Sequence, residues 1–91
     1  MPIDNQAYTV GTATATKLVA FDSMEQNVLI HNNATGEAIV YIGGADDVSS
    51  TNGTILVAEE RISIDVGPGD EIFGIGSTDG INVRVMKVTQ D

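Results

Sequence analysis

The chain has 91 residues, with thirteen Asp and Glu against four Lys and Arg, a formal net charge of −9, and no Cys or Trp. This length predicts a single domain, residues 1–91, with one core. A charge of −9 repels phosphate backbones, and the four basic residues form no run, so we expect no nucleic-acid partner. No segment approaches the ~20 consecutive apolar residues of a membrane-spanning helix, so we expect no membrane partner.

Short β-branched and apolar runs, separated by Gly, Asn, Asp or Ser, predict an all-β chain. Residues 7–10 read as a first short strand. Apolar and Thr residues alternate over residues 13–20, which predicts one long edge strand. Residues 22–26 are then expected to form a loop, in which Asp22 and Glu25 are spaced to cap a single helical turn.

The middle of the chain alternates strands with polar connections. Residues 28–31 predict a strand, and the Asn- and Gly-rich residues 32–36 are expected to close a hairpin into a strand at 38–42. Residues 43–54 form the longest polar stretch, and loops of that length usually have a function.

The remaining elements are bounded by strong turn signals. Residues 55–57 and 62–66 predict strands, and Ser63 and Asp65 should face water between core residues. Pro68 and Gly69 predict a turn in which Gly69 takes a positive φ.

Strands are expected next at residues 72–75 and 81–88, with a turn at 77–80. Gly74 and Gly76 leave gaps that suit a bulge or a close neighbouring backbone. The whole pattern predicts seven or eight short antiparallel strands in a single small β-sandwich or jelly-roll-like barrel. The strand order cannot be chosen from the sequence.

Residues with catalytic or ligand-binding chemistry are few. His31 has no nucleophile or carboxylate near it in sequence, so we expect a structural role. Asp46, Asp47, Asn52 and Gly53 offer oxygen ligands, but the spacing of a calcium loop is absent, which favours a solvated turn.

Adjacent acids occur at two predicted turns, Glu59 with Glu60 and Asp70 with Glu71. They could be paired as glycosidase carboxylates, although few aromatic residues remain to stack a sugar ring. We therefore expect no enzyme activity, no catalytic residue, no cofactor and no metal.

A group of short segments gives the chain a family resemblance. It resembles small all-β proteins of tailed-bacteriophage virions, which include head decoration or cement proteins. The resemblance covers about residues 28–88 and consists of turns and strand fragments, so it transfers no site residue. The matching segments are Val40-Tyr41-Ile42-Gly43-Gly44, Asp47-Val48, Thr51-Asn52-Gly53, Gly69-Asp70-Glu71-Ile72-Phe73-Gly74-Ile75 and Val83-Arg84-Val85.

This resemblance implies a virion protein on the capsid surface, made in the host cytoplasm, that binds the major capsid protein as a homo-oligomer, with a trimer favoured. A small domain without disulfides gains stability by burying surface against another copy or a partner. An interface on one outward face of the strands would use Tyr41, Phe73 and Met86 as anchors. The alternative is that these three residues belong to the core.

Two other functions remain open. The chain could be a receptor- or glycan-binding module of a phage tail fibre, with the loop at residues 43–54 contacting the host. It could also be an accessory β domain of bacterial origin without a virion role. Saturable binding to cell-surface polysaccharide would distinguish the tail module from a decoration protein.

Overall fold

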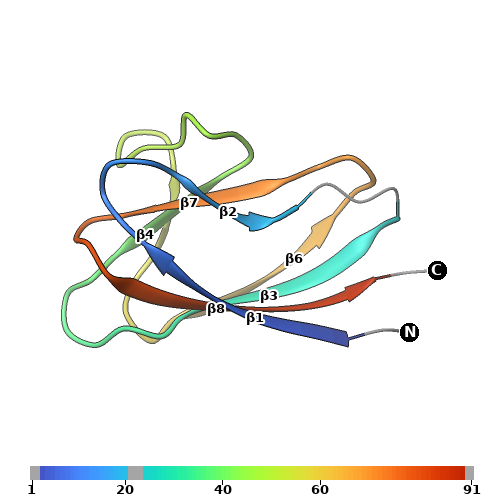
Figure 1. The fold of residues 1–91 in the computed structure, drawn as a ribbon, viewed down its shortest axis with the longest axis horizontal. Helices are drawn as coiled ribbons and strands as arrows, with labels where there is room; N and C mark the ends of the chain where they lie inside the picture. The colour runs from blue at the N-terminus through green and yellow to red at the C-terminus, as the bar shows by residue number, and fades with distance from the viewer. Residues whose placement is uncertain (1–2, 21–23, 90–91) are drawn as a thin grey trace.

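A computed structural model describes residues 3–20 and 24–89. They form an all-β sandwich of two four-stranded antiparallel sheets, as the sequence predicts. The described part measures 37 × 24 × 16 Å, and its first and last strands run side by side (Figure 1). The strands are β1 (Ile3–Val10), β2 (Thr16–Val19), β3 (Gln26–Asn32), β4 (Val40–Gly43), β5 (Thr54–Leu56), β6 (Arg61–Val66), β7 (Ile72–Gly76) and β8 (Ile81–Thr89).

The strand order is that of a jelly roll. The first sheet has the order β1-β8-β3-β6, and the second sheet has the order β2-β7-β4-β5. Strands pair as β1 with β8, β2 with β7, β3 with β6 and β4 with β5. The chain is therefore a long antiparallel ribbon wrapped into two facing sheets, which is how eight strands make a jelly roll. Only the connection from β4 to β5 stays within one sheet.

The predicted hairpin at residues 32–36 is wrong, because β3 and β4 belong to different sheets. The buried Asn32 at the end of β3 fixes this crossing. Its side-chain amide donates to the carbonyls of Ala38 and Leu56 at 3.2 and 3.0 Å, and its side-chain oxygen accepts from the Ala34 amide at 3.2 Å. A buried amide with these partners holds together the end of β3, the end of β5 and the connection that leads into β4.

The first two strands differ from their predicted lengths. β1 begins at Ile3 rather than residue 7, because it pairs with β8 over its whole length. The long strand predicted at residues 13–20 is only β2, with a register shift between Lys17 and Val19. β2 is an edge strand as expected. Residues 13–15 are not part of it, because an alternating pattern of small residues does not by itself provide a strand to pair with. The helical turn suggested from Asp22 falls partly outside the described residues.

The predicted turn around Gly69 is confirmed, and so is the close backbone expected at Gly76, where a Cβ would lie 2.7 Å from the Thr78 carbonyl oxygen. The Asp70 amide donates to the Gly67 carbonyl at 3.1 Å, and Gly69 has φ +83°, so this turn needs a glycine. In β7, a Cβ on Gly74 would lie 2.9 Å from Leu18 Cδ1. The space beside Gly74 is therefore filled by the Leu18 side chain rather than by the bulge or close backbone that the sequence predicted.

The core lies between the sheets and is built mainly from β-branched residues. Ile62 and Ile64 pack against it from β6, while Ser63 and Asp65 face water, as the alternation predicts. Inward side chains from both sheets interlock in this way in aligned sandwiches. The buried core residues are Val10, Leu18, Val19, Val28, Ile30, Val40, Ile42, Leu56, Val66, Ile72, Ile81, Val83 and Val85.

Candidate functional site

The candidate sites lie on the two outward faces of the sandwich. Tyr41 and Phe73 lie on neighbouring strands β4 and β7, on the outer face of the second sheet. Met86 lies on the outer face of the first sheet and is 39 % exposed. None of the three belongs to the buried core. The structure therefore brings two of the predicted anchors together and places the third on the opposite face.

An apolar row lies across three of the four strands on the outer face of the second sheet. Tyr41 is paired with Ile55 on one side and with Ile75 on the other. Ile55 is 57 % exposed, whereas Tyr41 and Ile75 are half-buried. We call Ile55, Tyr41 and Ile75 the apolar row. An antiparallel sheet commonly presents polar residues on its solvent face, so a row without any charged side chain is notable.

Phe73 extends this apolar surface toward the β2 edge. The Lys17 ammonium lies 5.7 Å from the centre of the Phe73 ring and forms an ion pair with Glu71 at 2.8 Å. The lysine is half exposed and its partner carboxylate is nearby, so these contacts are weak. They place a neutral ion pair beside the Phe73 ring, with the ammonium over the ring, and leave the apolar row free of net charge.

The long loop at residues 43–54 is ordered by its own contacts. The Ser49 amide donates to Asn52 Oδ1 at 2.7 Å, and the Gly53 amide donates to the Ser49 carbonyl at 2.9 Å. Val48 is buried and packs against Gly43, where a Cβ would come within 2.8 Å of its side chain. Much of the loop's hydrogen-bonding capacity therefore goes into its own turn.

The outer face of the first sheet carries a row of basic residues. Ala7, Arg84, His31 and Arg61 are partners across β1, β8, β3 and β6. We call Arg84, His31 and Arg61 the arginine row. Neither arginine forms an ion pair with a carboxylate of residues 3–20 or 24–89. Two of the four Lys and Arg residues thus share one surface with the single histidine.

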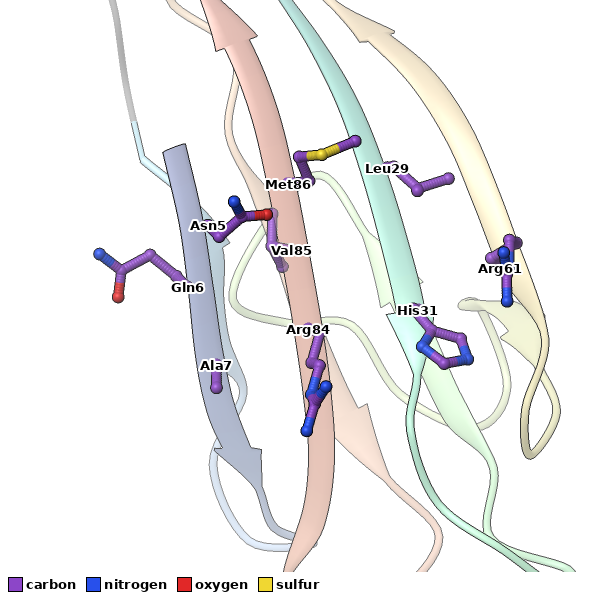
Figure 2. Close-up of a pocket in the computed structure, with 9 residues that line it drawn as sticks. All are labelled: Asn5, Gln6, Ala7, Leu29, His31, Arg61, Arg84, Val85 and Met86. Atoms are coloured by element: carbon purple, nitrogen blue, oxygen red, sulfur yellow. The ribbon is translucent and has the colours of Figure 1, made fainter. Parts of the chain in front are cut away.

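This row borders a groove of about 460 Å³. Figure 2 shows Arg84, His31 and Arg61 at one end of the groove and Met86 and Leu29 farther along the same strands. Met86 is the partner of Leu29, so these two side chains form an apolar pair next to the arginine row. The groove therefore combines basic and apolar side chains.

The other residues considered for chemistry do not line this groove. Glu60 accepts a hydrogen bond from the Val57 amide at 3.1 Å, so it stabilises its own turn. Asp46 and Asp47 are exposed in the loop. Within the described residues, no three His, Cys, Asp or Glu side chains are grouped to hold a metal ion. Nor do these residues form a helix with the length and apolarity that crossing a membrane requires.

Four surface residues of interest were not predicted from the sequence: Ile55, Ile75, Arg61 and Arg84. The two isoleucines follow the period of their strands and read as core without knowledge of which face points outward. The arginines lie far apart in the chain and form no run. Their alternation with core residues in β6 and β8 was the only available signal, because it predicts outward side chains.

Comparisons with known proteins inform the fold. No model of a protein family matches the chain, and no curated protein matches it. A solved structure described as "Bacillus endospore appendages form a novel family of disulfide-linked pili" is similar, with a TM-score of 0.59 and 12% sequence identity. The match covers 99% of this chain and 87% of that chain. At this identity the likeness shows a shared fold.

Proposed function

We propose that the chain is a non-enzymatic structural protein of a tailed-phage virion. In this role it is a head decoration protein that binds the major capsid protein lattice as a homo-oligomer, with a trimer favoured. The apolar row on the second sheet carries the proposal, because exposed apolar surface of this kind marks protein contact sites. Ile55, at 57 % exposure, gains most from being covered.

The charge of the chain supports a second copy as the occupant of the apolar row. Two chains of net charge −9 repel each other, so a contact between them is least costly where charge is lowest. The apolar row contains no ionisable group other than the Tyr41 hydroxyl, and the nearby Lys17 and Glu71 neutralise each other. Copies that meet at this face bury apolar surface with little electrostatic cost. Met86, on the opposite face, is outside this contact.

The decoration role comes from the resemblance to small virion proteins, together with the size and charge of the chain. A decoration protein must be soluble at high concentration and gain stability when it docks on a lattice. The similar Bacillus structure belongs to a protein that forms pili, which is an analogy at the level of the fold. Disulfide linkage of that kind needs cysteine, and this chain has none.

The test is the absolute mass of the purified protein in solution, followed by co-sedimentation with capsids of the phage that encodes it. We expect a trimer that saturates capsids at a fixed ratio. A monomer that does not sediment with capsids would contradict the proposal. Phe73→Ala should weaken assembly and leave the monomer folded, since Phe73 lies outside the core.

The tail-fibre alternative places host contact in the loop at residues 43–54. Several of its polar groups are engaged in the turn around Ser49 and Asn52, which leaves fewer to bind a sugar. Binding of the same preparation to host cell-surface polysaccharide, without capsid binding, would favour this alternative over decoration.

A further inference from the structure

The geometry points to a second binding site, independent of the decoration role, in the groove on the outer face of the first sheet. It takes an extended acidic segment of a partner protein. One carboxylate of the segment is held by the arginine row, and an apolar side chain two residues along the segment packs on Met86 and Leu29.

The two arginines of the arginine row have no acidic partner among the described residues. Arg84 and Arg61 lie on either side of His31, each as its direct partner on a neighbouring strand. The chain has thirteen acids, yet no carboxylate of the described residues pairs with either arginine. A carboxylate from outside the chain would therefore gain charge-assisted hydrogen bonds without displacing an existing partner.

The basic and apolar residues of the groove are two residues apart along each strand. Arg84 and Met86 are two residues apart on β8, so their side chains leave the same face about 7 Å apart. On β3, His31 and Leu29 have the same relation. Figure 2 shows this basic end and this apolar end lying along the same two strands. Side chains two residues apart in an extended segment also point to the same side. An acidic residue and an apolar residue two positions later therefore match the basic and apolar ends of the groove.

The β1 side of the groove leaves room for such a segment. Ala7, the β1 partner of Arg84, carries only a methyl group, and β1 is an edge strand of its sheet. The guanidinium of Arg84 is thus approachable across Ala7 from the open edge. An incoming segment can also reach the unpaired backbone of β1, which adds hydrogen bonds that do not depend on sequence.

The net charge selects a short acidic segment over a polyanion. Nucleic acid or a sulfated glycan presents many charges to a chain of net charge −9 and is repelled at long range. A segment with one carboxylate requires only the local attraction of the arginine row. The neighbouring Met86 and Leu29 also favour an apolar side chain, which a sugar-phosphate backbone does not supply.

The experiment is an NMR titration of the ¹⁵N-labelled protein with the capped pentapeptide Gly-Asp-Ser-Leu-Gly. We expect saturable shift changes at the amides of Ala7, Leu29, His31, Arg84 and Met86, and much smaller changes with the peptide in which Asn replaces Asp. Shift changes confined to other surfaces, or equal binding of the Asn peptide, would overturn the proposal.

Two variants make the test specific. Arg84→Gln should weaken peptide binding about tenfold or more, because it removes a charge-assisted pair. Lys17→Gln removes the same charge from the second sheet and should leave binding unchanged. Equal weakening by both variants would show a general charge effect and overturn the site. Binding of a heparin hexasaccharide at these residues in place of the peptide would also overturn it. Capsid binding is not involved, so the outcome is separate from that of the decoration test.

Discussion

The two sheets have similar inward faces and different outward faces. Inside, both contribute β-branched side chains to one core, and the second sheet adds Leu18 and Leu56. Outside, the second sheet presents the apolar row, whereas the first presents the arginine row beside Met86 and Leu29. The interior is set by the need to exclude water, which both sheets meet in the same way. The outward faces are free to differ, so they are where separate binding roles can arise.

The two sheets also differ in the length of their edge strands. The first sheet ends in β1, with eight residues, and β6, with six, whereas the second ends in β2, with four, and β5, with three. Short or irregular edge strands discourage pairing with other chains, and β2 also carries a register shift. The second sheet is thus suited to contact through its face, and the first offers both a face and a long open edge.

The largest expected effect comes from the side chain that joins the sheets. Asn32→Ala removes three hydrogen bonds of a buried side chain, and we expect it to lower the free energy of unfolding by about 2–4 kcal/mol. Urea unfolding of the monomer measures this change. The matched control is Asn33→Ala, which removes an exposed bond to Asn82 and should cost less than about 1 kcal/mol. Equal losses would mean that Asn32 does not hold the crossing between the sheets.

The next prediction compares the two outward faces directly. Ile55→Ser and Met86→Ser each shorten an exposed apolar side chain, one on each sheet. We expect Ile55→Ser to raise the dissociation constant of self-association about tenfold, as truncation of a contact residue does, and Met86→Ser to leave it unchanged. Sedimentation equilibrium measures both constants. The reverse result would assign the contact between copies to the first sheet.

The smallest effect is expected at the edge of the apolar surface. Lys17→Gln removes the ion pair with Glu71 and the contact with the Phe73 ring. Both contacts are at least partly exposed, so the free energy of unfolding should fall by less than about 1 kcal/mol. Thermal unfolding at low and high salt measures it, and the difference from the unaltered protein should shrink as salt rises. A loss of several kcal/mol would show that the ion pair is structural.

Much of the local structure could be predicted from the sequence. The alternation in residues 62–66 and the turn around Gly69 are confirmed, because strand period and positive φ depend on neighbouring residues. The hairpin expected at residues 32–36 failed because its Asn and Gly residues suit several kinds of reversal. Asn32 there meets Leu56, a partner that turn chemistry does not specify.

The candidate surfaces were less predictable than the strands. Tyr41 and Phe73 were singled out for their size, but which face they occupy depends on which side of each strand meets the other sheet. His31 was considered alone, and its position between Arg84 and Arg61 arises only when β8 and β6 pair with β3 on either side.

The sequence alone thus determined that the chain is all-β, where most of its strands and turns lie, and that it is strongly acidic. Only the tertiary structure decided the order of the strands, the crossing between sheets after Asn32, and the gathering of Arg84, His31 and Arg61 into one row. The physical reason is the separation along the chain between the residues that interact. Period and turn geometry are set by residues next to each other, whereas β1 pairs with β8 across nearly the whole chain, and such pairing depends on how all the inward faces pack together.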